Sequence, residues 1–378
     1  MIEAEVFYNL LIENNIDFFT GVPDSLLKSF CAYITDNTVS DNHIISANEG
    51  SAVGLAAGYH LATGKTPLVY MQNSGEGNAI NPLLSLIDPE VYQIPLVLVI
   101  GWRGEPGVKD EPQHKKQGRI TCSFLDTMEI PYVIMSTNET ELKKQMQICC
   151  KTIKEQKIPF AFVVRKDTFA PYVLQNNQAI QASMSREEAI ECVILSADDS
   201  AVFVSTTGMA SRELYELREK HAMGHNQDFL TVGSMGHASQ IALTIALNCP
   251  ERTVYCIDGD GATIMQMGGL ATIGVRSPDN YRHILINNGA HDSVGGQPTV
   301  GLEIDLPGIA KAVGYKNIFS VQTKESLIDV LKKMKNITGT TMIEIKTRKG
   351  ARKDLGRPKS TPVENKNALM EFIGIKGN

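Results

Sequence analysis

Short apolar runs recur along the whole chain, and longer stretches with the mixed apolar and polar pattern of helices lie between them. The runs are rich in β-branched residues and end at turn residues, which favours strands. Strands that alternate with helices are typical of parallel sheets covered by helices on both faces. We expect strands at residues 68–71, 96–100, 160–164, 202–205, 254–257, 284–286 and 342–345.

The alternation lapses once, between residues 166 and 188, where Ala170-Pro171-Tyr172 precedes a segment rich in Gln and Asn. Such a segment is typical of a linker. The length of 378 residues also exceeds the usual size of a single core. We therefore predict an α/β protein with two doubly wound parallel-sheet domains and no middle domain. The domains should span residues 1–170 and 188–378, with a linker at 171–187.

The composition excludes several classes of partner. The formal net charge of −6 is mild and no long basic run is present, which argues against binding to nucleic acid. No apolar run has the length of a membrane span, and the first residues lack the features of a secretory signal. The seven cysteines include no C-x-x-C pair, as in many reduced intracellular proteins. We expect a soluble, cytoplasmic protein.

The most specific chemical signal is Gly259-Asp260-Gly261, which stands where an expected strand gives way to an expected helix over 262–273. The free N–H groups at the start of a helix suit a diphosphate, and glycine lets an anion approach the main chain. Asp260 adds a hard oxygen ligand. A second expected strand ends in Asn287-Asn288, whose amide oxygen can complete the shell of the same cation. Magnesium prefers such oxygen ligands.

The spacing between the Gly-Asp-Gly and the Asn pair supports a shared site, and two other interpretations of the glycines are weaker. Residues 262–286 leave room for one helix and one returning strand, which is a βαβ crossover. A dinucleotide site is disfavoured because residues 259–264 lack the third glycine of G-x-G-x-x-G. A plain strand-to-helix turn would explain a lone Gly-Asp-Gly, but it does not explain the Asn pair.

The combination resembles the cofactor signature of the thiamine diphosphate enzymes, a Gly-Asp-Gly followed by Asn-Asn after one crossover. The resemblance implies thiamine diphosphate and Mg²⁺ as cofactors, with the metal held by Asp260, Asn288 and the carbonyl of Ala290. It also implies that Gly261 and Ala262 contact the diphosphate. Many members carry a third domain for which this chain has no room. The resemblance therefore narrows to compact two-domain decarboxylases of 2-oxo acids.

Further cofactor contacts are implied by the same resemblance. Thr207, Gly208 and Ser211 stand where an expected strand ends and a helix begins, and family members contact the diphosphate there. The carbonyl of Gly233 would accept a hydrogen bond from the exocyclic amine of the cofactor, and Met235 would be the apolar wedge that keeps the cofactor bent. A methionine between glycines is otherwise often a gap-filler in a core.

Glu49 lies between an extended apolar segment and a helix rich in small residues. The resemblance implies that its carboxyl group hydrogen-bonds the pyrimidine ring and activates the cofactor, and burial would help this acid hold or share a proton. Alternatively, Glu49 only favours the positive end of the helix. Because Glu49 and Asp260 belong to different halves, the family pattern implies a homo-oligomer with each active site shared by two chains.

Residues 289–299 resemble those decarboxylases whose small 2-oxo acid carries a tetrahedral anion. The resemblance implies a decarboxylase whose substrate is a phosphonate-bearing pyruvate. The alternatives are a decarboxylase of the sulfonate analogue, a carboligase that uses the same cofactor, and a non-catalytic subunit. Arg103 offers a planar fork for phosphonate oxygens. A polar loop over 108–118 would close over the site, and its Lys109 and Lys115 are more simply solvated charges. Further candidates for holding substrate or moving protons are Asp24, Ser25, His114 and His291.

Overall fold

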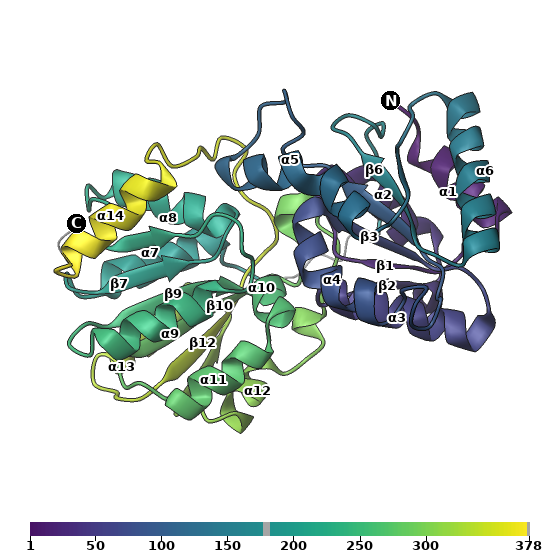
Figure 1. Cartoon of the computed structure of the whole chain (residues 1–378). Coiled ribbons are helices and arrows are strands. Elements are labelled where there is room, and N and C mark those ends of the chain that lie inside the picture. The colour runs from purple at the N-terminus through teal and green to yellow at the C-terminus, as the bar shows by residue number, and fades with distance from the viewer. Residues whose placement is uncertain (177–181, 376–378) are drawn as a thin grey trace. The chain divides into compact units, whose positions relative to one another are not determined.

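The computed structural model describes residues 1–176 and 182–375. The chain divides into two compact units. Unit 1 comprises residues 1–177 with 293–297, and unit 2 comprises residues 178–292 with 298–378. Each unit contains a six-stranded parallel sheet with helices on both faces (Figure 1). The predicted fold class is therefore confirmed. Part of the predicted linker, 177–181, lies outside the described residues, and the exact domain bounds stay a prediction.

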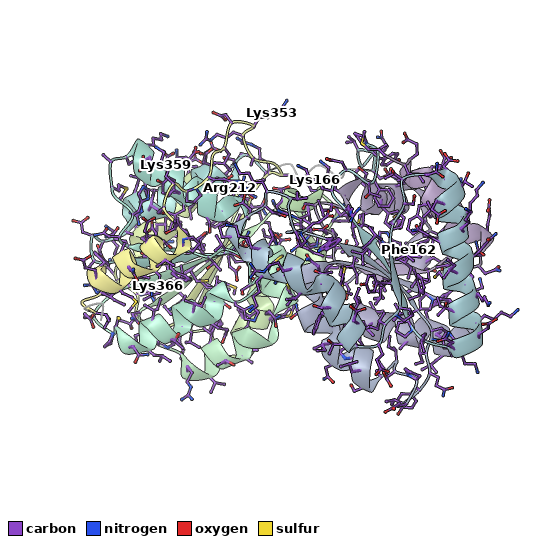
Figure 2. The ribbon with its side chains drawn as sticks, turned by 45° about the horizontal axis from the view of Figure 1, so that its top comes forward. Phe162, Lys166, Arg212, Lys353, Lys359 and Lys366 are labelled. Atoms are coloured by element: carbon purple, nitrogen blue, oxygen red, sulfur yellow. The ribbon has the colours of Figure 1, made fainter. Side chains whose placement is uncertain are left out.

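In unit 1 the strands are ordered β2-β1-β3-β4-β6-β5. Along β4 the side chains alternate, so Val97 and Val99 enter one core while Leu98 and Ile100 enter the other. Phe162 of β6, labelled in Figure 2, belongs to the first core. The strands are β1 (Phe19–Gly21), β2 (His43–Ile45), β3 (Leu68–Gln72), β4 (Val97–Gly101), β5 (Tyr132–Ile134) and β6 (Phe160–Val164).

The helices of unit 1 fall into two sets, one for each core. The first core takes side chains from α1 (Ala4–Glu13), α2 (Lys28–Asn37) and α6 (Glu139–Gln156). The second core takes them from α3 (Glu49–Thr63), α4 (Glu76–Ser85) and α5 (Pro112–Thr127). Two short 3₁₀ helices, η1 (Ser40–Asn42) and η2 (Asn73–Gly75), complete the connections.

Unit 2 repeats the same arrangement, because its order β8-β7-β9-β10-β12-β11 is that of unit 1 with six added to each strand number. Its strands are β7 (Val202–Ser205), β8 (Asp228–Leu230), β9 (Val254–Gly259), β10 (Tyr281–Asn287), β11 (Asn317–Val321) and β12 (Thr341–Lys346). One face packs on α7 (Arg186–Ser196), α8 (Met209–Lys220) and α13 (Lys324–Met334). The other packs on α9 (Ala238–Asn248), α11 (Gly268–Arg276), α12 (Leu306–Ala312) and α14 (Pro362–Phe372). Shorter helices are α10 (Asp260–Met265), η3 (Asp292–Val294) and η4 (Val300–Leu302).

Three local predictions need correction. The helix expected over 262–273 is two helices, α10 and α11, because the backbone leaves the helical region at Gln266 and two glycines follow at 268 and 269. The loop expected over 108–118 is partly helix, since α5 begins at Pro112, and proline is favoured in the first turn. Strands β1, β2, β5, β8 and β11 were not predicted.

The basic segment 347–359, between β12 and α14, contains no helix or strand. Lys353 and Lys359, labelled in Figure 2, are exposed, whereas Arg352 pairs with Glu187 and Glu216. Helix α14 then closes the sheet edge at β8, where Asn365 accepts from the N–H of Leu230 and donates to the carbonyl of Asp228. Within 1–176 and 182–375, no helix has the length and apolar character needed to cross a membrane.

A fully buried ion pair of unit 2, between Arg218 and Asp228, should be a strong determinant of its stability. Arg218 donates to both oxygens of Asp228 at 3.1 and 2.8 Å, and the two side chains are 1% and 0% exposed. Asp228→Ala leaves the buried guanidinium unpaired, so we expect the free energy of unfolding to fall by about 3–5 kcal/mol in urea titrations. The double variant Arg218→Met/Asp228→Leu should recover most of the loss.

The control is Lys144→Ala, which removes an exposed ion pair with Glu141 and should leave the free energy of unfolding almost unchanged. If Asp228→Ala lowered the free energy of unfolding no more than this control, the buried pair would not be a strong determinant of stability.

Candidate cofactor site

The residues of unit 2 predicted to bind the cofactor or its metal follow the carboxyl ends of neighbouring strands. Gly208 follows β7, Gly233 follows β8, Asp260 follows Gly259 of β9, and Asn288 follows β10. These strands are adjacent in the order β8-β7-β9-β10. In open α/β sheets, ligands bind outside the carboxyl ends where the strand order reverses, here between β7 and β9. The fold therefore gathers the predicted residues at one edge.

Asp260 is a buried carboxylate at the first position of α10 and is 3% exposed. Burial raises its pKa to about 6, against hydrogen bonds from Thr299 and from the N–H groups of Asn288 and Gly261. Among the described residues, no Lys, Arg or His forms an ion pair with it. A buried acid without a cationic partner fits a bound cation. Because α10 has only six residues, its dipole contributes less than the sequence suggested.

The two asparagines of the pair have different surroundings. Asn287 donates to the carbonyl of Gly301 at 2.6 Å and to Glu344 at 2.8 Å, so it fixes the strand end to its neighbours. Asn288 donates from Nδ2 to Asp292 at 2.7 Å and accepts at Oδ1 from the N–H of Ala290 at 3.0 Å. A second lone pair on Oδ1 of Asn288 is therefore left for a ligand.

The chain after Asn288 folds back on the same edge. Ala290 forms an isolated antiparallel bridge with Pro298, and the N–H of Thr299 donates to Gly289 at 3.0 Å. This return brings the Thr299 hydroxyl to Asp260. A carboxylate, an amide oxygen and a main-chain carbonyl at one edge are the hard oxygen donors that a divalent cation such as Mg²⁺ takes.

The other predicted diphosphate residues form a second loop cluster at this edge. Gly208 caps α8 with a φ of 97°, a backbone conformation that favours glycine. Ser211 donates to the carbonyl of Thr206 at 2.7 Å. Thr207 accepts from the N–H of Gly233 at 3.1 Å, which ties the β7 loop to the β8 loop.

Met235, the predicted wedge, is half-buried in a turn between residues with positive φ, Ser234 at 46° and Gly236 at 86°. A Cβ on Gly236 would lie 2.6 Å from Gln266 and 2.9 Å from the carbonyl of Ala262. The turn that carries Met235 therefore packs closely against α10. The structure thus brings Met235 and Ala262 into one region, while the roles of both stay predictions.

Behind the glycines, a buried polar group holds the end of β9. Asp258 accepts from the N–H of Gly259 at 3.0 Å and from Thr263 at 3.1 Å, and it lies 3.4 Å from Nε2 of His283. His283 is in turn 3.1 Å from the hydroxyl of Tyr315. These contacts fix the first turn of α10 from below, which helps to preorganise the Gly-Asp-Gly turn.

His291 lies against the same turn. A Cβ on Gly261 would be 3.2 Å from Cε1 of His291, and burial lowers the pKa of this histidine to about 4. The neutral ring is thus a neighbour of the predicted diphosphate residues.

In unit 1 the predicted activating acid, Glu49, is the first residue of α3 and is 5% exposed. Asn78 donates to its Oε2 at 2.9 Å. Gly75 faces the carboxyl group so closely that a Cβ there would lie 2.5 Å from Oε1. Sequence reasoning missed both supporting residues. The motif Gln-Asn-Ser-Gly-Glu-Gly-Asn at 72–78 was the only available signal.

The predicted substrate residues of unit 1 gather around Arg103. Its NH1 donates to Ser25 at 2.8 Å, and its Nε and NH2 donate to the two oxygens of Asp110 at 2.8 and 2.5 Å. Asp110 was not predicted, although it shares the polar loop with Lys109. Lys109 and Lys115 are exposed, in line with the solvated role expected of them.

Asp24 and His114 belong to the same neighbourhood. Asp24 is 1% exposed, burial raises its pKa to about 6, and a Cβ on Gly101 would come within 2.2 Å of its Oδ2. Burial lowers the pKa of His114 to about 4, with the charge of Arg103 acting in the same direction. One buried acid and one neutral histidine therefore lie near the guanidinium of Arg103.

Comparisons with known proteins identify the class. The description "Thiamine pyrophosphate enzyme, N-terminal TPP binding domain" matches residues 1–129, and the corresponding C-terminal TPP binding domain matches residues 206–345. Thiamine pyrophosphate is another name for thiamine diphosphate. The fold and the site thus define a thiamine diphosphate enzyme, as the sequence predicted.

Whole-chain relatives narrow the class. A phosphonopyruvate decarboxylase of Streptomyces viridochromogenes is 35% identical over 364 residues, which cover 91% of this chain and 89% of the relative. Another from Streptomyces hygroscopicus is 33% identical, covering 90% and 88%. A sulfopyruvate decarboxylase of Methanosarcina acetivorans is 28% identical, covering 98% of both. The chain belongs to the family of thiamine diphosphate-dependent decarboxylases of 2-oxo acids, and it is a carboxy-lyase.

The close approach of Gly301 to the side chains of Asp260 and Asn287 gives a direct test of this site. A Cβ at residue 301 would lie 2.6 Å from Oδ2 of Asp260 and 3.0 Å from Oδ1 of Asn287. We expect Gly301→Ala to displace the carboxylate and to weaken thiamine diphosphate binding in the presence of Mg²⁺ by roughly 10-fold or more, measured by calorimetry.

Gly268→Ala is the matched control, because a Cβ at this exposed position of α11 would meet nothing within 4 Å. Equal affinities for the two variants would show that Asp260 does not hold the cofactor through this geometry.

Proposed function

We propose that the protein decarboxylates 3-phosphonopyruvate to phosphonoacetaldehyde and carbon dioxide, with thiamine diphosphate and Mg²⁺ as cofactors. The observation that carries the cofactor part is the buried carboxylate of Asp260, which accepts from the main-chain N–H of Asn288 and pairs with no Lys, Arg or His among the described residues. Likeness to two phosphonopyruvate decarboxylases over about nine tenths of the chain supports the substrate. Loss of carbon dioxide would make the step effectively irreversible and suits an enzyme of phosphonate biosynthesis.

In this proposal the residues of unit 2 hold the cofactor. Asp260, Asn288 and the carbonyl of Ala290 would bind Mg²⁺, and the backbone at Gly261 and Gly208 would face the diphosphate. When bound, thiamine diphosphate supplies an electron sink for the departure of carbon dioxide. The neutral ring of His291, packed against Gly261, would add a hydrogen bond to the diphosphate without adding a charge.

Glu49 would hold a proton at the pyrimidine ring nitrogen. Its Oε2 is engaged by Asn78, which leaves Oε1 as the oxygen that faces Gly75. Such an arrangement restricts the carboxyl group to one rotamer, and a fixed acid transfers or shares a proton at a defined atom. Because Glu49 and Asp260 lie in different units, we also propose the homo-oligomer of the family, in which each active site draws on two chains.

Arg103 would contact the phosphonate group, and Asp110 limits how it can do so. A guanidinium has five N–H donors. Two donate to Asp110 and one to Ser25, so two remain for an anion. Asp24, with its pKa raised to about 6 by burial, can carry a proton near neutral pH and is a candidate acid in the same cluster.

Decarboxylation of sulfopyruvate is the second candidate. Likeness to the sulfopyruvate decarboxylase of Methanosarcina acetivorans over 98% of the chain favours it, and a sulfonate is also a tetrahedral anion beside a 2-oxo acid. A sulfonate carries one negative charge, whereas a phosphonate carries up to two. A binding site for the phosphonate therefore requires more positive charge than one for the sulfonate.

A side-by-side assay tests the substrate. We expect the purified protein with Mg²⁺ and thiamine diphosphate to release carbon dioxide from phosphonopyruvate with a higher kcat/KM than from sulfopyruvate or pyruvate. Arg103→Met removes charged hydrogen bonds, so it should lower kcat/KM by roughly 10- to 100-fold for phosphonopyruvate and by less for pyruvate.

Lys109→Met, in the same loop but exposed, should leave both values near those of the wild type. Faster release from sulfopyruvate would replace the proposed substrate. Equal losses of Arg103→Met on phosphonopyruvate and pyruvate would mean that Arg103 does not read the phosphonate.

The position of Gly75 tests the role of Glu49. A Cβ at residue 75 would lie 2.5 Å from both Oε1 and Cγ of Glu49, whereas a Cβ on Gly77 would meet nothing within 4 Å. We expect Gly75→Ala to move the carboxyl group and to lower kcat roughly 10²-fold, as Glu49→Gln should. Gly77→Ala should retain the wild-type kcat in the carbon dioxide assay. Glu49→Gln with normal turnover would remove Glu49 from the mechanism.

A further inference from the structure

Asp292 stands beside the predicted metal ligands, and its carboxylate is the centre of a hydrogen-bond cluster. Its Oδ2 accepts from Nδ2 of Asn288 at 2.7 Å, from NH1 of Arg186 at 3.1 Å and from the N–H of Gly350 at 3.0 Å. Its side chain is only 11% exposed. A carboxylate that receives three donors on one oxygen is held firmly in a single orientation.

Arg186, the first residue of α7, is itself fixed from the other side. Its Nε and NH2 donate to the two oxygens of Glu213 in α8 at 2.7 and 3.0 Å. The side chains of Arg186 and Glu213 are 9% and 2% exposed. The guanidinium therefore bridges Glu213 and Asp292, and its planar fork sets the direction in which NH1 points at Asp292.

The consequence for Asn288 follows from the chemistry of an amide. An amide side chain has one end that only accepts and one end that only donates, and the two ends exchange places when the group turns over. The anionic Oδ2 of Asp292 can pair only with the donating end. Nδ2 of Asn288 must therefore face Asp292, and Oδ1 must face the side where Ala290 donates its N–H at 3.0 Å.

We propose that Arg186 and Asp292 are positioning residues that set the amide orientation of Asn288, so that its oxygen rather than its NH₂ group faces the metal. The inference rests on the proposed function, in which Asn288 is a metal ligand. With the amide turned over, its NH₂ group would face the cation. Repulsion would then replace the attraction between the amide oxygen and the metal. Partners of metal ligands commonly act in this way, through orientation rather than contact.

The test uses Asp292→Asn, which keeps the shape of the side chain and removes its charge. Because a neutral amide can pair with either end of Asn288, the turned-over orientation becomes accessible. We expect the affinity for Mn²⁺ in the presence of thiamine diphosphate, measured by electron paramagnetic resonance of free Mn²⁺, to fall roughly 10- to 100-fold. The kcat at saturating metal should recover toward the wild-type value.

A second background separates orientation from general structural support. In Asn288→Asp the two oxygens are equivalent, so orientation no longer matters, and the anionic Asp292 now repels its neighbour. Asp292→Asn should therefore lower the metal affinity of the Asn288→Asp variant much less than it lowers that of the wild type. A role limited to packing would give losses of similar size in both backgrounds, and that result would overturn the proposal.

Arg348→Met is the matched control, because Arg348 forms an exposed ion pair with Glu188 in the same segment as Gly350. It should leave the Mn²⁺ affinity unchanged. A loss in this control equal to that of Asp292→Asn would also count against the role of Asp292. Absence of metal-dependent cofactor binding in the wild type would overturn the proposed function itself, whereas binding without this difference between the two backgrounds would overturn only the role of Asp292 and Arg186.

Discussion

The arrangement of unit 2 depends on one unfavourable burial, that of the Asp260 carboxylate. Taking an ionised carboxylate out of water has an effective penalty of several kcal/mol, and its raised pKa of about 6 reports that penalty. Hydrogen bonds from Thr299 and from the main chain compensate part of it. Among the described residues no cationic side chain compensates the remaining penalty, and the groups predicted to bind the metal beside Asp260 present oxygen atoms. A divalent ion would therefore stabilise the folded site as well as bind the cofactor, since binding to the native state alone shifts the folding equilibrium.

The two sheets share one strand order, and the site residues predicted from local sequence stand at comparable places in both. The candidate site residues follow β1, β2, β3 and β4 in unit 1 and β7, β8, β9 and β10 in unit 2, which are corresponding strands. Long apolar runs such as 160–164 and 202–205 were found because their length and β-branched composition exceed those of loops. Three-residue strands such as β1 and β8 have too few positions to show a period, and they are set by pairing with the adjacent strands β2 and β7. The break between α10 and α11 was missed because the packing of Gly269 against Gln240 is a tertiary contact.

The supporting residues of the site could not be found from sequence for a related reason. Asp260 and Glu49 sit in motifs whose glycines, asparagines and small residues are close in the chain. Asp292 and Arg186 are 106 positions apart, and the meaning of each depends on the other. Asp110 stands only seven residues from Arg103, yet the loop between them gives no periodic signal that would orient two side chains face to face. Sequence patterns thus predicted the groups that would touch ligands, whereas the groups that would orient them emerged only from the three-dimensional contacts.

The charge balance around Arg103 bears on how a dianion would be accepted there. Arg103 is already paired with Asp110, and Asp24 adds a second acid, so the three side chains sum to a net negative charge when Asp24 is ionised and to zero when it is protonated. An incoming phosphonate disfavours the ionised form of Asp24 through like-charge repulsion, which raises its pKa further. In the proposed site, binding of the anion and protonation of Asp24 are therefore coupled. The substrate would meet a neutral, proton-bearing acid beside a shared guanidinium, and a monoanionic sulfonate would drive this coupling less strongly than a phosphonate dianion.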